Sequence, residues 1–172
     1  MTWHEQVAPD MYVGRFCMDY DKEFPKDATV VIDLTAEFGQ NEEVLKDRQY
    51  FLLPALDCTM PPADELLNLA RTLSNLKGKQ MMYIHCANGH GRSSSLAAVI
   101  MLVRGTVVNW QDAFETMRQY RPLINIQPAQ ERVLDRCQAM LSIDGAREVR
   151  SENHDADVEP GEIELVNQRK DQ

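Results

Sequence analysis

One stretch of this chain, residues 85–94, combines a cysteine, two glycines and an arginine at spacings that suit chemistry on an anion. It lies where a predicted strand turns into a predicted helix. Backbone amides in such a turn point inward, and the N-terminus of the helix adds partial positive charge. Gly89 and Gly91 permit unusual dihedral angles and a close approach of the backbone to a ligand. The stretch therefore predicts a loop that cradles an anion.

Arg92 and Cys86 supply that loop with a clamp and a nucleophile. The planar guanidinium of Arg92 matches two oxygens of a phosphate and stays charged at physiological pH. The loop amides, the helix terminus and the guanidinium together stabilise the thiolate of Cys86. A thiolate attacks phosphorus to form a cysteinyl phosphate, which water then hydrolyses. Ser93, next to Arg92, is a candidate to hydrogen-bond the departing sulfur.

The competing interpretation is that Cys86 is a small buried hydrophobe at a strand end and that the glycines only turn the chain. With average amino-acid usage, Gly, Arg and Ser at these three offsets from any cysteine of the chain arise by chance on the order of one time in a thousand. The chemical interpretation is therefore the favoured one.

The sequence Cys86-x5-Arg92-Ser93, preceded by His85 after an apolar strand, resembles the signature of cysteine-dependent protein tyrosine phosphatases. The resemblance runs from residues 8–14 through 53–57 to Arg121-Pro122, and it is to the small dual-specificity branch. It implies a phosphatase that needs no metal and no cofactor. It also implies that phosphate is bound by the loop residues Cys86, Ala87, Asn88, Gly89, His90, Gly91 and Arg92. Finally, it implies that His85 helps to orient the cysteine, whereas the alternative is a structural histidine at a strand end.

A proton donor is needed to expel an alkoxide or phenoxide from phosphate, and it is normally a carboxylic acid. Asp57 lies 29 residues before Cys86, directly after an apolar strand. The dual-specificity family places its acid similarly, so we assign Asp57. Asp64 is the competing candidate. It lies just ahead of a predicted amphipathic helix, where a negative charge interacts favourably with the helix N-terminus, and this explains its position. Asp33, at the end of a strand, is predicted to be structural.

Other polar residues near these candidates keep two interpretations each. His90 either contacts substrate or faces solvent. Cys58 is either an inert thiol, which is favoured, or a disulfide partner of Cys86 on oxidation. Gln127 and Gln130 either position the hydrolytic water, as a glutamine does in larger relatives, or pack at a helix start, which is favoured.

The apolar pattern predicts the elements that must position these residues. Strands are predicted over residues 28–34, 49–56 and 80–85, and helices over 64–76, 92–103, 109–120 and 129–141. Strands that alternate with helices, followed by helices in succession, indicate an α/β fold with a central, mostly parallel sheet flanked by helices. Such a fold is also the dual-specificity phosphatase fold that the resemblance implies.

The length and charge of the chain limit its domain organisation and its partners. A chain of 172 residues predicts one domain, which we assign to residues 1–143. Residues 144–172 hold nine acidic and four basic side chains and little apolar periodicity, so a disordered tail is expected there. The net charge of −9 argues against nonspecific binding to nucleic acid or to an anionic bilayer.

Location and redox state are also predicted from the sequence. The longest strongly apolar run, residues 96–103, is far shorter than the roughly 20 residues of a membrane span. The N-terminus lacks a secretory pattern, and a cytoplasmic protein is expected. The four cysteines are scattered, so neither a disulfide scaffold nor a zinc site is indicated.

The expected partners are phosphorylated proteins. The expected target is phosphotyrosine, and phosphoserine or phosphothreonine as well. The chain has no room for the segments that deepen the pocket of larger enzymes, and a shallow cleft admits several phosphoresidues. An alternative is a phospholipid, phosphoinositide or RNA 5′-phosphate substrate. The net charge and the absence of lysine in residues 87–91 weigh against polyanions. A second alternative is a phosphate-binding module without turnover.

Overall fold

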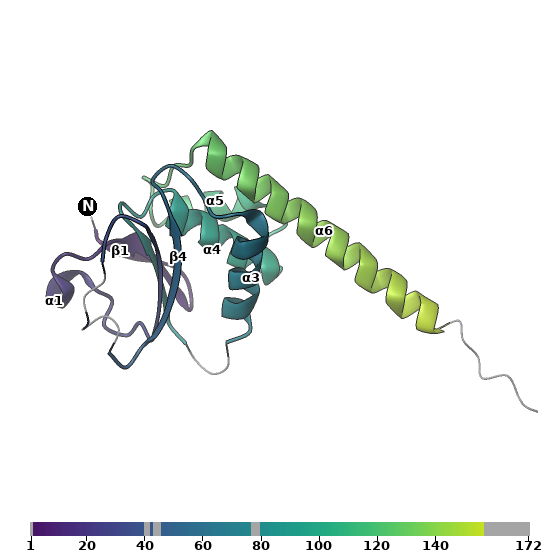
Figure 1. The fold of residues 1–172 in the computed structure, drawn as a ribbon, viewed down its shortest axis with the longest axis horizontal. Coiled ribbons are helices and arrows are strands. Elements are labelled where there is room, and N and C mark those ends of the chain that lie inside the picture. Colours follow the sequence, from purple (N-terminus) through teal and green to yellow (C-terminus); the bar gives the residue numbers. More distant parts are fainter. Residues whose placement is uncertain (1, 40–41, 43–45, 77–79, 157–172) are drawn as a thin grey trace, which may run out of the picture. The chain divides into compact units, whose positions relative to one another are not determined.

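The computed structural model describes residues 2–39, 42, 46–76 and 80–156. The chain divides into two units, Met1–Leu141 and Ser142–Gln172, and the first holds the sheet and every candidate site residue (Figure 1). No helix in the described ranges combines the length and the apolar character that crossing a membrane requires.

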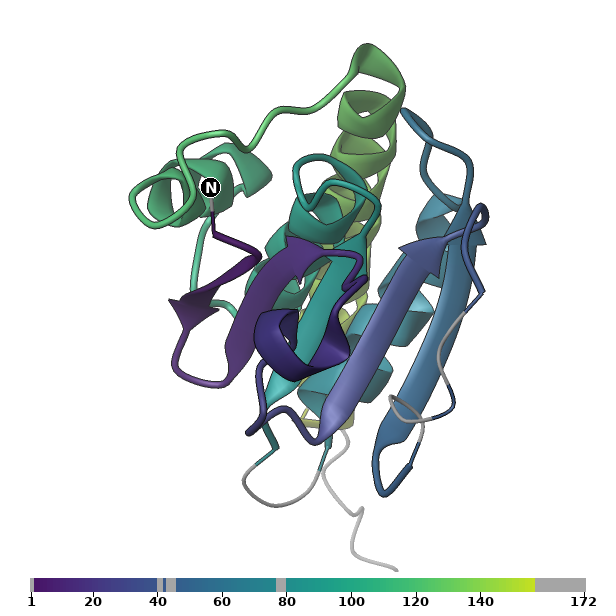
Figure 2. The same ribbon diagram turned by 90° about the vertical axis from the view of Figure 1, so that its left-hand side faces the viewer.

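A five-stranded sheet forms the centre of the first unit (Figure 2). Its strands, in spatial order, are β1 (His4–Ala8), β2 (Met11–Arg15), β5 (Met82–Cys86), β3 (Val30–Thr35) and β4 (Gln49–Ala55). β1 and β2 are antiparallel, and every other neighbouring pair is parallel. The predicted mostly parallel sheet and the three predicted strands are therefore confirmed, with bounds that differ by one or two residues.

β3 and β5 are two of the three inner strands, and all of their residues are buried. Alternate side chains point to opposite faces of the sheet. Ile32 and Ile84 belong to the main core cluster, whereas Val31 and Tyr83 belong to a smaller cluster with Phe24. Because both faces are covered, these strands read as continuous apolar runs rather than alternating ones.

The β1–β2 hairpin and the short helix α1 (Tyr20–Glu23) were not expected from the apolar pattern. β1 is an edge strand with the sequence His-Glu-Gln-Val-Ala, of which only Val7 is fully buried. A half-exposed edge strand of five residues carries too few apolar side chains to be distinguished from a loop. The hairpin matters for function because β2 lies directly beside β5.

Four longer helices cover the sheet, and all four were predicted. They are α3 (Ala63–Ser74), α4 (Arg92–Val103), α5 (Trp110–Arg118) and α6 (Pro128–Ala156). α3 is amphipathic and buries Leu66, Leu67, Ala70 and Leu73. α4 is buried on nearly all sides, because α3, α5 and the sheet pack around it.

α6 is longer than the sequence predicted. We expected this helix to end at Leu141, but it continues to Ala156, through the first part of the region expected to be disordered. The added residues include several good helix formers, among them Ala146, Arg147 and Glu148, so the helix propagates without an apolar face. Residues 157–172, the rest of that region, lie outside the described residues. The domain boundary at residue 143 stays a prediction.

Candidate active site

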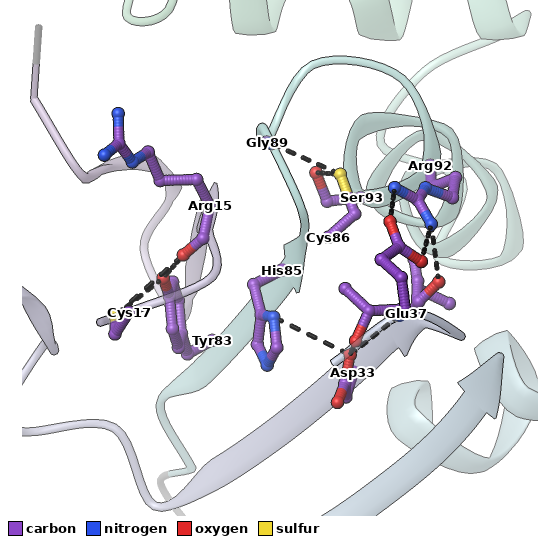
Figure 3. A network of polar contacts seen from close by, with 12 residues as sticks. Arg15, Cys17, Asp33, Glu37, Tyr83, His85, Cys86, Gly89, Arg92 and Ser93 are labelled. Carbon is purple, nitrogen blue, oxygen red and sulfur yellow. Dashed lines mark hydrogen bonds and ion pairs between the residues drawn. The ribbon is translucent and has the colours of Figure 1, made fainter. Parts of the chain in front are cut away.

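The candidate site forms where β5 ends and α4 begins, at the carboxyl edge of the parallel strands. Ligands in open α/β sheets bind at this edge. Cys86 is the last residue of β5 and is buried. Its Sγ accepts a hydrogen bond from the Gly89 amide at 3.2 Å and lies 3.4 Å from the Ser93 Oγ (Figure 3). The loop therefore brings a donor amide, a thiol and a hydroxyl together, as the sequence predicted.

Two glycines allow the loop to close tightly. Gly89 has φ of 69°, and a Cβ there would lie 2.4 Å from the carbonyl carbon of Gly14 in β2. A Cβ on Gly91 would lie 2.7 Å from the amide oxygen of the buried Gln130 in α6. The loop is therefore packed on one side by β2 and on another by the start of α6.

Arg121 holds the outer side of the loop. It lies between α5 and α6, is buried, and donates from Nε to the Gly89 carbonyl at 2.7 Å and from Nη2 to the Asn88 carbonyl at 3.2 Å. Its charge is paired with Glu5 of β1. Drawing these two carbonyls outward leaves the adjoining peptide units free to direct amides inward, where partial positive charge attracts an anion.

Arg92 opens α4 and is only 1% exposed. Its guanidinium donates to both carboxylate oxygens of Glu37, at 2.6 and 2.9 Å, and to the Ala55 carbonyl at 2.7 Å (Figure 3). This bidentate pairing with Arg92 lowers the pKa of Glu37 to about 2. Arg92 is thus fixed by a carboxylate from the segment after β3 and by the end of β4.

Asp57 follows β4 and lies at the same site. Its Oδ1 is 3.1 Å from Nη2 of Arg92, while its side chain is 65% exposed. The structure therefore brings the predicted acid beside the predicted phosphate clamp, on a solvent-accessible loop. Asp64, the competing acid, lies in the first turn of α3, where negative charge favours the helix, as its structural interpretation predicted.

A cleft of about 160 Å³ opens over Cys86. It is lined by Asp57, Cys58, Cys86, Asn88, His90, Gly91, Arg92, Asn125, Gln127 and Gln130. All of these except Asn125 were considered in the sequence analysis. Within the described residues, no group of three or more His, Cys, Asp or Glu side chains is placed to hold a metal ion.

The glutamines and Cys58 have different surroundings in this cleft. Gln130 accepts from the Gln127 amide at 2.9 Å and donates to the Thr59 carbonyl at 3.2 Å, so it ties the start of α6 to the loop after β4. This arrangement matches the packing interpretation of Gln130, although its side chain also lines the cleft. Cys58 is exposed and forms no disulfide with another described cysteine.

His85 precedes the nucleophile and is buried beside Asp33 of β3. The His85 Nδ1 lies 3.8 Å from the Asp33 Oδ1 (Figure 3). Burial lowers the pKa of His85, and the negative charge of Asp33 partly opposes this effect. Asp33 also accepts from the Tyr50 hydroxyl at 2.8 Å and from Thr35. Asp33 therefore lies in the layer beneath the loop.

The two remaining cysteines lie outside the cleft. Cys137 of α6 is buried in the main core, and burial, reinforced by the charge of Asp64, raises its pKa to about 11. Cys17 is half-buried beside the Tyr83 hydroxyl at 3.3 Å, and burial raises its pKa. These surroundings disfavour a thiolate at neutral pH.

Two residues that organise the site had no role in the sequence analysis. Glu37 was not considered, although a polar residue just after a predicted buried strand is a candidate for the carboxyl edge of a parallel sheet. Arg121 was noted only as part of the resemblance. No local pattern reveals its contact with the loop, because 32 residues separate it from Gly89.

The family model described as protein-tyrosine phosphatase matches residues 2–138. Among solved structures, Tk-PTP in its active form is 20% identical, with a TM-score of 0.70, over 80% of this chain and 97% of that chain. PTPMT1 in complex with PI(5)P is 18% identical, with a TM-score of 0.72, over 83% and 99% of the two chains. Human DUSP28 is 13% identical, with a TM-score of 0.70, over 81% and 99%. No curated protein matches the chain by sequence search.

These solved structures have the same fold as this chain, and a putative dual-specificity phosphatase is among them. The family model covers the sheet, the loop of residues 86–92, the loop that carries Asp57 and the start of α6. With its signature loop at the carboxyl edge of the sheet and the family model matched over residues 2–138, the chain belongs to the protein-tyrosine phosphatase family.

Proposed function

We propose that the chain is a cysteine-dependent phosphomonoester hydrolase of the protein-tyrosine and dual-specificity type. One observation carries the proposal. The buried Cys86 Sγ is hydrogen-bonded by the Gly89 amide in a loop that also carries Arg92, and Asp57 lies 3.1 Å from that arginine. Cys86, Arg92 and Asp57 all line one cleft, and this supports their roles as nucleophile, phosphate clamp and acid.

In the first step, the Cys86 thiolate attacks phosphorus and the bond from phosphorus to the leaving oxygen breaks. Asp57, in its acid form, gives its proton to that oxygen. Arg92 and the loop amides hold the phosphate oxygens while charge redistributes. His85 supports the position of the cysteine from beneath the loop. The products are a cysteinyl phosphate and the dephosphorylated alcohol or phenol.

In the second step, water attacks the phosphorus of the intermediate. The Asp57 carboxylate accepts a proton from this water, so the acid of the first step acts as the base of the second. The sulfur–phosphorus bond breaks, inorganic phosphate leaves, and Ser93 donates a hydrogen bond to the departing thiolate. The Ser93 Oγ lies 3.4 Å from Sγ, within reach for this role. The cycle requires neither a metal nor a cofactor.

The proposed substrates are proteins that carry phosphotyrosine, and phosphoserine or phosphothreonine as well. The cleft of about 160 Å³ is lined mostly by polar side chains, which suit the phosphate group that all three phosphoresidues share. The second candidate is a phosphoinositide, since the similar PTPMT1 was solved in complex with PI(5)P. The chain's net charge of −9 disfavours a polyanionic headgroup.

The test is hydrolysis of p-nitrophenyl phosphate with a chelator present, from pH 5 to 8. We expect turnover by the wild type, none by Cys86→Ser, and a kcat lowered about 10²- to 10⁴-fold by Asp57→Asn, the range typical of a lost general acid. Asp64→Asn is the matched control and should keep wild-type activity. An inactive wild type that still binds phosphate or tungstate would favour the phosphate-binding module instead.

A further inference from the structure

A second hollow lies beside the cleft over Cys86, between α5 and the start of α6. Its volume is about 260 Å³. It combines apolar with charged side chains, and those that matter for binding are Trp110, Phe114, Ile126, Glu115, Arg118 and Glu131. The proposed chemistry makes no use of this hollow, although it lies next to the site.

Asn125 joins the hollow to the cleft, because it is exposed and lines both. The residues that follow it are divided between the two. Ile126 and Glu131 line the hollow, whereas Gln127 and Gln130 line the cleft. The segment of residues 125–131 therefore separates the two spaces. An extended peptide advances about 3.4 Å per residue, so a side chain a few positions from a phosphorylated residue in the cleft is within reach of the hollow.

The charges that line the hollow are more negative than positive. Glu115 and Glu131 are exposed, and within the described residues neither carboxylate forms an ion pair or a hydrogen bond. Arg118 donates from Nε to the Ile124 carbonyl at 3.4 Å and lies over Phe114, with its guanidinium carbon 5.7 Å from the ring centroid. Among the described lining residues, two carboxylates thus stand against one guanidinium that is already engaged. The hollow therefore favours a cation.

Trp110 supplies the hollow with a fixed aromatic ring. Its Nε1 donates to the Asp135 Oδ1 at 2.9 Å, and its backbone amide donates to the Gln138 Oε1 at 3.0 Å. Its ring meets the Phe114 ring at 85°, with the centroids 5.8 Å apart. An indole attracts a cation placed over its face, and the methylene groups of lysine and arginine pack on apolar surface. The apolar side chains and the free carboxylates together match the stem and the head of a basic side chain.

We propose that this hollow is a subsite that binds an arginine or lysine side chain near the phosphorylated residue of a protein substrate. The inference rests on the proposed function and narrows its substrate class. Glu131 and Glu115 bind the cationic head, and Trp110 packs against it. Arginine binds better than lysine, because a planar, weakly hydrated guanidinium stacks well on an aromatic ring. An acidic side chain at the same position is repelled.

The experiment measures kcat/KM of the full chain on phosphotyrosine peptides. At each flanking position in turn, the peptide carries Arg, Gln, Glu or norleucine. The wild type should prefer Arg over Gln about tenfold at one or two neighbouring positions, as expected of an exposed ion pair and a cation–π contact together. Glu131→Gln should lower this ratio, and Glu131→Lys should bring it to one or below.

Glu65→Lys is the matched control. Glu131 and Glu65 are both exposed and lie in the first turn of a helix, α6 and α3 respectively. The two reversals therefore change the net charge and the helix terminus equally, but Glu65 is not part of the hollow. Glu65→Lys should keep the wild-type ratio of Arg to Gln. Both variants should hydrolyse p-nitrophenyl phosphate, which has no flanking residues, at the wild-type rate.

Three results would overturn the subsite. The first is a wild type that hydrolyses p-nitrophenyl phosphate but treats the Arg and Gln peptides alike at every position. The second is a norleucine peptide as good as the Arg peptide, which would assign the hollow to apolar side chains. The third is a Glu131→Lys variant that keeps the wild-type preference.

Binding separates this inference from the proposed function. A wild type that hydrolyses no phosphomonoester overturns the proposed function. The ratio of Arg to Gln is then taken from the dissociation constants of the same peptides on the full chain with Cys86→Ser, which need no turnover. Equal dissociation constants, or no binding of any peptide, would overturn the subsite as well.

Discussion

The Arg92 guanidinium is oriented by contacts within the protein. Glu37 takes two of its hydrogen bonds and the Ala55 carbonyl a third, so the buried guanidinium has one geometry. Under the proposed mechanism, Glu37 is a positioning residue that acts on catalysis through Arg92. It also contributes to stability, because a buried guanidinium without a partner is strongly unfavourable.

Replacing Glu37 should affect both activity and acid stability. We expect Glu37→Gln to lower kcat/KM about 10- to 100-fold through misplacement of Arg92. The pKa of Glu37 falls from its ordinary 4.5 to about 2 on folding. Its carboxylate therefore stabilises the fold above about pH 4.5, and this contribution is lost as the pH falls toward 2.

Urea unfolding at pH 6, 4 and 3 measures this stability difference between wild type and Glu37→Gln. The difference should be largest at pH 6 and should shrink as the pH falls. Glu115→Gln, on the exposed face of α5, is the control and should give no such trend. A difference that grows with acidity would contradict the role of Glu37.

At the scale of elements, the loop of residues 86–92 is held by three segments that are distant in sequence. β2 contacts it at Gly14, the segment after α5 contacts it through Arg121, and α6 contacts it through Gln130. The N-terminus of α4 directly follows this loop and adds partial positive charge to it. The loop thus has little freedom, which keeps its amides aligned without a ligand.

Gly89→Ala should therefore abolish the loop geometry. The new Cβ would meet backbone atoms of Gly14 at 2.4 and 2.5 Å, in addition to the unfavourable positive φ. We expect a loss of stability of about 1–3 kcal/mol and a decrease in kcat/KM greater than about 100-fold. Thermal unfolding and p-nitrophenyl phosphate hydrolysis measure the two effects.

Gly105→Ala is the matched control for this substitution. Gly105 has φ of 65°, but no atom lies within 4 Å of a Cβ there. It should lose about 1 kcal/mol of stability through backbone strain and keep its kcat/KM. Equal losses of activity in both variants would show that the packing against Gly14 is unimportant.

At the scale of the whole molecule, the first unit contains every buried core residue of the described chain. The last fully buried side chain is Cys137, and the cleft ends in sequence at Gln130. The core spans both faces of the sheet, with the larger cluster under the longer helices and the smaller one around Phe24. Folding and catalysis should therefore depend on residues 1–143 alone.

A chain that ends at residue 143 should unfold cooperatively at a Tm close to that of the full chain and keep its kcat/KM. A chain that ends at residue 132 also loses Leu134 and Cys137 from the core. Removal of buried side chains of this size costs several kcal/mol, comparable with the whole stability of a small domain, so this chain should not fold. Circular dichroism on heating distinguishes the two results. Failure of the 143-residue chain to fold would refute the domain boundary.

The local pattern was sufficient to predict β3, β4 and β5, the longer helices and the strand–loop–helix that carries Cys86 and Arg92. Each of these strands and helices contains a run or a periodic pattern of apolar residues, and the turn that carries Cys86 contains glycines at positions suited to an anion-binding loop. The β1–β2 hairpin was missed because β1 is a half-exposed edge strand and β2 has only five residues, so neither shows a clear apolar run. The end of α6 was misplaced because helix propensity, rather than an apolar face, extends it.

The amino-acid sequence alone predicted a nucleophile, a phosphate loop, its clamp and an acid at a suitable spacing, because these lie within one loop or just after one strand. The fold was needed to show that Glu37 pairs with Arg92 and that Arg121 donates to the loop carbonyls. Both contacts join segments 32 or more residues apart. Such contacts depend on which strands are neighbours in the sheet, and local patterns do not specify that order.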